Sequence, residues 1–172
     1  MYSAASSCII KKTQSGGRRV RLLIVIEKSV RRLTLIRGDA GPLTFPVSLG
    51  KQPEGHKMRE GDLRTPEGEY YICTKNAKSK YHLALGLSYP NPSDADASLA
   101  RGEISPEQHS AITSAHASMR RPPWDTPLGG FIMIHGGGTG GDWTAGCIAL
   151  DNKDMETLFS LCPMGTRVRI LP

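Results

Sequence analysis

The 172-residue sequence is poor in cysteine, in aromatic residues and in long apolar runs. Its four cysteines are too few for a disulfide scaffold, and no Cys-x-x-Cys or His-x-x-x-His pair of the kind that binds zinc is present. No apolar stretch approaches the ~20 residues of a membrane-spanning helix. Residues 1–19 lack the apolar core of a signal peptide, because Lys11 and Lys12 interrupt it. The sequence therefore predicts no metal site and no transmembrane segment, and residues 1–19 do not match a signal peptide.

Only 6% of the residues are aromatic, whereas glycine (19) and proline (12) are plentiful. Many tight turns and few long helices are expected from this composition, which favours a β-rich fold. Hydrophobic residues (38%) and charged residues (22%) are in the range of globular proteins, and the length suits one domain with a core of its own.

Positive charge is concentrated at the start of the chain. The net charge is +6, but residues 1–37 hold nine lysines and arginines against Glu27 alone, so the remainder is slightly acidic. We expect residues 1–19 to form a flexible basic arm ahead of a folded domain at 20–172. The arm could bind nucleic acid, an anionic membrane surface or an anionic cell-wall polymer, although a solubilising surface is the simpler explanation. No motif supports nucleic-acid binding.

Short β-branched or alternating runs, bounded by turn residues, predict the strands. The predicted strands lie at 22–26, 30–36, 43–49, 69–74, 81–87, 131–134, 147–150 and 166–171.

One region between the strands is helical. Ser93 or Asp94 can begin a short helix, and Ser105, followed by proline and then by glutamine three residues after it, is a strong start for a second one. These form a helical insertion at about 93–119, and a C-terminal helix is expected at about 152–161. The predicted fold is thus mainly β, a sandwich or mixed sheet with a helical insertion.

Two reactive residues stand near the ends of the segment FIMIHGGGTGGDWTAGCIAL (131–150). A thiol reacts as the thiolate and needs a base within hydrogen-bond reach. If the glycine-rich connection is a hairpin, His135 and Cys147 lie on adjacent strands, where facing Cβ atoms are about 4.5–5.5 Å apart. Gly146 would let the backbone approach closely, so that nearby amide groups could face a developing oxyanion. A glycine hairpin that holds a buried, inert thiol fits the same spacing.

The same segment resembles the signature of the L,D-transpeptidase (YkuD-type) catalytic domain. That signature is a histidine-glycine pair, a glycine-rich stretch and Ser/Thr-x-Gly-Cys, matched here by His135-Gly136 and Thr144-Ala145-Gly146-Cys147. Upstream, Thr65-Pro66-Glu67-Gly68 resembles the family's Thr-Pro-x-Gly turn, and 45–51 resembles its Val-x-x-Gly-Lys strand. The motifs occur in the family's order, so the resemblance covers about residues 20–172 and implies a YkuD-like fold.

The resemblance implies a cysteine enzyme that joins peptidoglycan stem peptides and needs no metal or organic cofactor. Cys147 would be the nucleophile, forming a thioester acyl-enzyme that a carbapenem could mimic, and His135 would be its base. The carbonyl of Gly136 would orient the base, and Thr144 matches the Ser/Thr position of the signature. Backbone amides near Ala145, Gly146 and Cys147 would form the oxyanion hole. The resemblance also implies a protein of the cell envelope, and we expect a monomer.

Two departures from the family pattern bear on what receives the acyl group. Many members have a second histidine where Ala145 stands, so His135 is the remaining candidate base. Many also have a polar residue two positions after the cysteine, where this chain has Ala149. Three functions stay open: transfer to a stem amine, hydrolysis as an L,D-carboxypeptidase or endopeptidase, and a catalytically silent cell-wall-binding module.

Further residues could line a substrate groove: His82, Tyr89, His116 and Trp143. His82 could equally be a hydrogen-bonded histidine on the sheet face, His116 a packed helix residue, and Trp143 part of the glycine turn. His56 is expected at the surface. A Cys73–Cys162 disulfide also stays open.

Overall fold

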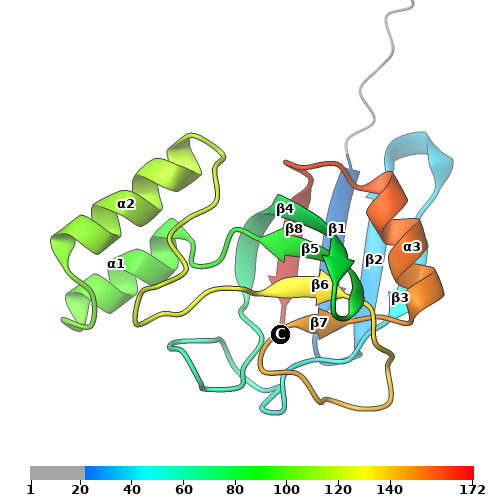
Figure 1. Ribbon diagram of the computed structural model, residues 1–172, viewed down its shortest axis with the longest axis horizontal. Helices are drawn as coiled ribbons and strands as arrows, with labels where there is room; N and C mark the ends of the chain where they lie inside the picture. Colours follow the sequence, from blue (N-terminus) through cyan, green and yellow to red (C-terminus); the bar gives the residue numbers. More distant parts are fainter. Residues whose placement is uncertain (1–21) are drawn as a thin grey trace, which may run out of the picture.

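The structure is a computed structural model that describes residues 22–172; the predicted basic arm at 1–19 lies outside the described residues. Eight strands form one curled, mixed sheet, and three α-helices accompany it (Figure 1). The mainly β fold with a helical insertion and a C-terminal helix, predicted from the sequence, is confirmed.

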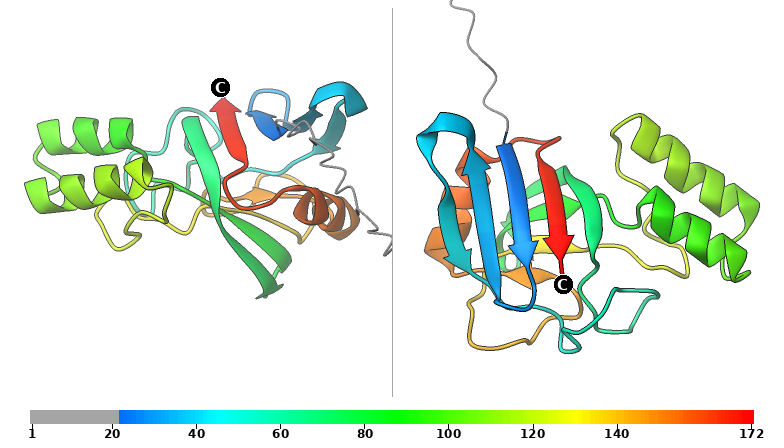
Figure 2. Two further views of the ribbon diagram at one scale, coloured as in Figure 1. Left: turned by 90° about the horizontal axis from the view of Figure 1, so that it is seen from above. Right: turned by 180° about the vertical axis from the view of Figure 1, so that it is seen from behind.

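The sheet is mixed and its strands do not follow chain order. The strands are β1 (Leu22–Glu27), β2 (Arg32–Arg37), β3 (Leu43–Pro46), β4 (Gly68–Ser79), β5 (His82–Leu87), β6 (Met133–His135), β7 (Ile148–Ala149) and β8 (Arg167–Leu171). Their order across the sheet is β3-β2-β1-β8-β4-β5-β6-β7. The pairs β1–β8 and β6–β7 are parallel, and the other neighbours are antiparallel. Figure 2 shows β3, β2, β1 and β8 side by side from behind.

Strand β4 joins the two halves of the sheet. Its first residues pair with β8 and its later residues with β5. The chain after β3 then brings the two outer strands together, because Ser48 bridges Ala149 of β7 through two backbone hydrogen bonds of 2.9 Å. A second bridge joins Gly50 to Thr144. The predicted strand at 43–49 therefore continues beyond β3 as a segment that closes the curl next to the glycine-rich loop.

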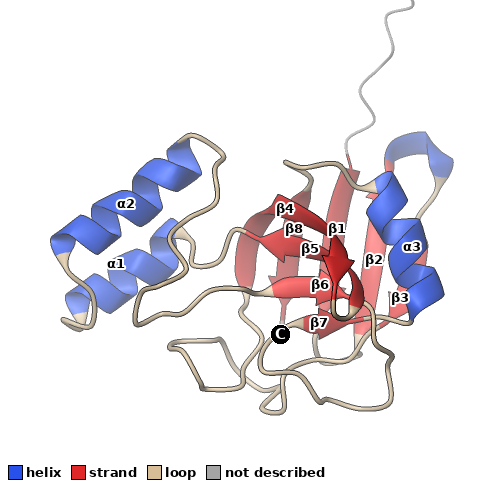
Figure 3. Cartoon of the chain, in the orientation of Figure 1, coloured by secondary structure: helices blue, strands red, loops and turns tan. Residues whose placement is uncertain are grey.

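The main core lies inside the curl. Alternate residues of the first two strands are fully buried, as their period of two predicts: Ile24, Ile26, Leu33 and Leu35. Helix α3 (Asn152–Leu161) packs on this core through Met155 and Leu158, and it lies beside the sheet in Figure 3.

The helical insertion forms a lobe beside the sheet (Figures 1 and 3). Helix α1 (Pro92–Ala100) and helix α2 (Pro106–Ala117) pack on each other around a small core that includes Ala95, Ile104, Ile112 and Leu128. Ser105 caps α2 as predicted, with the reciprocal bond from Gln108. Helix α1 begins earlier than predicted: Asn91 is its N-cap, because Pro92 suits the first helical position, and Asp94 supplies the reciprocal bond.

The predicted hairpin within 131–150 is wrong. Strands β6 and β7 run parallel, with Ile134 opposite Ile148 and His135 opposite Ala149. Because parallel strands cannot be joined by a tight turn, the glycine-rich residues 136–147 form a wide loop that leads back to the start of β7. Cys147 therefore lies beside β6, one residue ahead of β7, without being directly opposite His135.

The disulfide that the sequence left open is not formed. Cys73 and Cys162 are free, buried thiols. Burial raises the pKa of each to about 11, so both are protonated near neutral pH.

Candidate active site

Cys147 presents a half-buried thiol at the edge of β6. Its Sγ accepts a hydrogen bond from the N–H of Met133 and donates one to the carbonyl oxygen of Phe131, both at 3.4 Å. Burial raises the pKa of the thiol above its ordinary value, although the N–H of Met133 and the charge of Lys57 act in the opposite direction. The resting group is therefore a neutral thiol, and reaction requires a base to remove its proton.

Thr144 holds the turn that carries this thiol. Its hydroxyl donates to the carbonyl oxygen of Cys147 at 2.7 Å and accepts from the N–H of Gly146 at 3.1 Å. Gly146 has a φ of +130°, and a Cβ at this position would lie 2.6 Å from the carbonyl oxygen of Arg64. Only glycine fits such a place without strain. Because the N–H of Gly146 is already bonded, the predicted oxyanion donors narrow to the amides of Ala145 and Cys147.

The two upstream motifs brace the same turn. The N–H of Lys51 donates to the carbonyl of Thr144 at 3.0 Å, and the N–H of Thr144 donates to Leu49 at 3.1 Å. The hydroxyl of Thr65 accepts from the N–H of Gly50 at 3.0 Å. Three motifs that are far apart in the sequence are thus adjacent in space.

His135 is the last residue of β6 and is only 3% exposed. Its Nδ1 lies 2.6 Å from the carbonyl oxygen of Gly136. A carbonyl can only accept, so Nδ1 carries the proton and Nε2 keeps its lone pair. Burial lowers the pKa of the imidazole, and the charge of Lys80 lowers it further, against the opposing effect of the Gly136 carbonyl. His135 is therefore neutral, and able to accept a proton, at neutral pH.

Two aromatic rings fix the orientation of this imidazole. Tyr81 stacks on His135 with ring centroids 4.6 Å apart and 20° between the planes. Trp143 meets His135 edge-on at 5.7 Å, and its Nε1 donates to the carbonyl of Gly138 at 3.2 Å. Trp143 therefore packs both the glycine-rich loop and the histidine, while Tyr81 covers one face of the ring.

A family model for the L,D-transpeptidase catalytic domain, YkuD, matches residues 21–170. The chain belongs to this family. No curated protein matches it. Within residues 22–172, no three His, Cys, Asp or Glu side chains are grouped so that they could hold a metal ion, and no helix there is long and apolar enough to cross a membrane.

Solved structures share the YkuD fold at low sequence identity. The helical cell shape determining protein Pgp2 (K307A mutant) of Campylobacter jejuni is 22% identical, with a TM-score of 0.61 over 88% of this chain and 47% of that one. Bd1075 of Bdellovibrio bacteriovorus is 21% identical, with a TM-score of 0.55 over 88% and 48%. An L,D-transpeptidase of Mycobacterium smegmatis is 12% identical, with a TM-score of 0.52 over 89% and 59%. The chain thus spans less than two thirds of the length of each.

At the turn between β4 and β5 of this YkuD domain, His82 takes the hydrogen-bonded alternative and Tyr81 faces His135. His82, a predicted groove residue, bonds through Nε2 to Glu156 of α3 at 2.9 Å, whereas Tyr81, which was not predicted, stacks on His135. Adjacent strand residues face opposite sides. This alternation is interrupted at the turn, where His82 has a φ of +73°.

Two other predicted groove residues have structural roles in this YkuD domain. Tyr89 is fully buried and donates to the carbonyl of Leu128 at 3.0 Å, so its predicted place in a groove is wrong. The Nε2 of His116 lies 2.8 Å from the carbonyl of Ser88 and 3.0 Å from that of Pro90. His116 therefore fastens α2 to the chain after β5, which is the packed-helix alternative.

Proposed function

We propose that this protein is a cysteine-dependent L,D-transpeptidase that acts on peptidoglycan stem peptides, with Cys147 as nucleophile and His135 as general base. Family membership supports the reaction class. The assignment of these two roles is supported by the hydrogen bonding of His135. Its Nδ1 donates to the Gly136 carbonyl, so its Nε2 can accept a proton. The strand that ends in His135 also contacts the thiol of Cys147.

The first half-reaction forms a thioester. His135 Nε2 takes the proton of Cys147 as Sγ attacks the carbonyl carbon of the third residue of the donor stem. In this step the amides of Ala145 and Cys147 stabilise the oxyanion. The C–N bond to the fourth residue then breaks, and the imidazolium gives its proton to the leaving amine. In the resting structure the thiol donates to Phe131, so its proton must first turn toward His135.

The second half-reaction releases the acyl group. An amine of another stem attacks the thioester carbon while His135 accepts the amine's proton. The C–S bond breaks, and the proton returns to the Cys147 thiolate. Water in place of the amine would give hydrolysis, the alternative function. The substrate class implies action in the cell envelope, and the likeness to Pgp2, described as helical cell shape determining, supports a role in wall remodelling.

Product analysis tests the proposal and separates its alternatives. Purified protein is incubated with a disaccharide-tetrapeptide, and the products are resolved by chromatography and mass spectrometry. We expect a crosslinked dimer. Tripeptide alone would identify an L,D-carboxypeptidase that uses the same acyl-enzyme. Unchanged tetrapeptide, together with retained binding to isolated walls, would identify a silent binding module.

Replacing Lys80 by methionine should shift the acid limb of activity to higher pH. The charge of Lys80 lowers the pKa of His135, and only unprotonated Nε2 can accept the thiol proton. Without that charge the pKa rises, so more of the base is protonated at a given acidic pH. The measurement is kcat/KM for tetrapeptide as a function of pH. The matched control is Lys78→Met, an exposed lysine of β4, whose profile should not move. An unchanged acid limb in Lys80→Met would contradict the assigned base.

A further inference from the structure

A pocket of about 370 Å³ is lined mainly by polar and charged side chains. It lies between the loop at 52–64 and the loop that joins α1 to α2. Its lining residues are Gln52, Met58, Arg59, Asp62, Arg64 and Glu103. The proposed mechanism uses none of these side chains.

The two arginines of the pocket are not paired with its two acidic residues. Asp62 is already paired with Lys57 at 2.8 Å. Glu103 is paired with Arg101 at 2.8 Å, and Arg59 acts on it only at longer range. Within residues 22–172, neither Arg59 nor Arg64 has a hydrogen bond or ion pair through its guanidinium group. Both cations therefore remain available to a ligand.

Hydrogen bonds to Asp62 fix the backbone of the loop that carries the two arginines. The carboxylate of Asp62 accepts hydrogen bonds from the N–H groups of Met58, Arg59 and Arg64 at 2.8–3.1 Å. Burial alone would raise the pKa of this carboxyl, but Lys57 and these N–H groups lower it. Because the backbone is already ordered, a ligand would not have to order it on binding.

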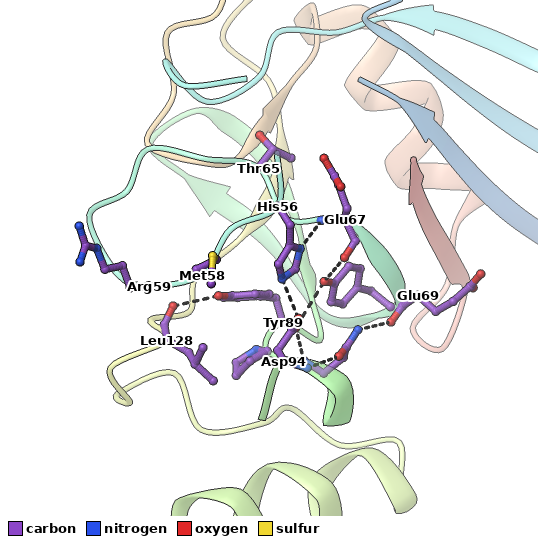
Figure 4. A network of polar contacts seen from close by, with 12 residues as sticks. His56, Met58, Arg59, Thr65, Glu67, Glu69, Tyr89, Asp94 and Leu128 are labelled. Carbon is purple, nitrogen blue, oxygen red and sulfur yellow. Dashed lines mark hydrogen bonds and ion pairs between the residues drawn. The ribbon is translucent and has the colours of Figure 1, made fainter. Parts of the chain in front are cut away.

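A second tie joins the start of this loop to the helical lobe (Figure 4). His56 accepts at Nδ1 from the N–H of Glu67 at 3.0 Å, and its Nε2 lies 2.9 Å from Oδ1 of Asp94 at the start of α1. Since Nδ1 accepts, Nε2 carries the proton and donates to Asp94. His56, expected at the surface, thus links this loop to the start of the helical lobe.

The pocket is connected to the turn that carries the nucleophile through the backbone of Arg64. The carbonyl of Arg64 packs directly under Gly146, next to the nucleophile. An extended peptide advances about 3.3 Å per residue. The guanidinium group of Arg64 packs against Gly55 in the same loop. A donor whose third carbonyl lies at Sγ of Cys147 would have to direct the carboxylate that ends its fourth residue toward this loop.

We propose that Arg59 and Arg64 bind the free terminal carboxylate of the donor stem peptide, on the leaving-group side of the scissile bond. The inference rests on the proposed function, which supplies the donor. Guanidinium groups bind carboxylates in a bidentate manner, and this recognition suits a site that must select peptides with a free end. Ala149, fully buried in β7, offers no polar group that could do so instead.

Binding to an inactive variant tests this without requiring turnover. Titration calorimetry on Cys147→Ala protein compares a tetrapeptide, the same peptide amidated at its C-terminus, and one amidated at an interior carboxyl. We expect terminal amidation to weaken binding at least about tenfold, the scale of a lost charge-assisted hydrogen bond, and interior amidation to change it little. Adding Arg64→Gln or Arg59→Gln should weaken binding of the free peptide and reduce this discrimination. Arg167→Gln, an exposed arginine of β8, is the matched control and should leave it intact.

The outcomes separate this inference from the proposed function. Equal binding of the free and terminally amidated peptides, or no binding of either, would overturn the inference. Stronger sensitivity to interior amidation would mean that the arginines contact a different carboxylate, which also contradicts it. Discrimination in the Cys147→Ala protein combined with no turnover by the unmodified protein would instead contradict the proposed chemistry.

Discussion

Cys147→Ala protein is expected to lose roughly 10⁴-fold or more of its tetrapeptide turnover, the scale seen when a catalytic nucleophile is removed. The remaining backbone donors and His135 cannot form a thioester. The thiol is only half-buried, and its two hydrogen-bond partners are backbone groups of Phe131, which precedes β6, and of Met133, the first residue of β6. Its loss should therefore leave the melting temperature nearly unchanged. The measurement pairs turnover with thermal unfolding of the same samples.

Cys162→Ala provides the opposite pattern as a control. This thiol is fully buried in the main core, so its removal should lower stability by about 1–2 kcal/mol while turnover by the folded protein persists. If Cys147→Ala retained turnover, or Cys162→Ala lost it while folded, the assignment of the nucleophile would be wrong.

Gly146→Ala should damage both stability and activity. The added Cβ would meet the carbonyl oxygen of Arg64 at 2.6 Å, and φ at this position is +130°. Strain and overpacking of this kind cost about 2–4 kcal/mol together. The turn can relieve the contact only by moving, which displaces the Cys147 thiol and the amides beside it. We therefore also expect a fall in kcat of at least about 100-fold, the effect of losing an oxyanion donor.

Gly140→Ala is the matched control in the same loop. A Cβ at Gly140 would have no atom within 4 Å, and its φ is not in the left-handed region. Its activity and unfolding free energy should stay close to those of the unmodified protein. Equal losses in both variants would mean that the loop as a whole, rather than the contact between Gly146 and Arg64, controls the site.

Short-range patterns predicted the parts of the fold that depend on neighbouring residues. The capping box at Ser105 and the alternation in β1 and β2 are fixed by contacts within a few residues or between adjacent strands, so both were confirmed. The family resemblance, carried by the motifs around Cys147, was confirmed as well, because those motifs are short and keep their order along the chain.

The same short-range patterns could not predict how residues far apart in the sequence are arranged. A glycine-rich connection serves a hairpin or a wide loop equally well, so the parallel pairing of β6 and β7 was missed. The phase of the β4–β5 turn decides whether Tyr81 or His82 faces His135, and sequence alternation does not fix that phase. The free guanidinium groups of Arg59 and Arg64 depend on Asp62 and Glu103 having other partners, which no sequence pattern reveals.

The most direct test of the proposed chemistry is to trap the acyl-enzyme and locate it. Protein mixed with tetrapeptide, or with a carbapenem as a longer-lived analogue, is quenched in acid, digested and mapped by mass spectrometry. The mechanism predicts one adduct, on the peptide that carries Cys147, because His135 serves this thiol as a base. It predicts none on Cys73 or Cys162, which are buried, protonated thiols without an assigned base. An adduct on another residue, or tetrapeptide turnover with no thioester at Cys147 in rapidly quenched samples, would contradict it.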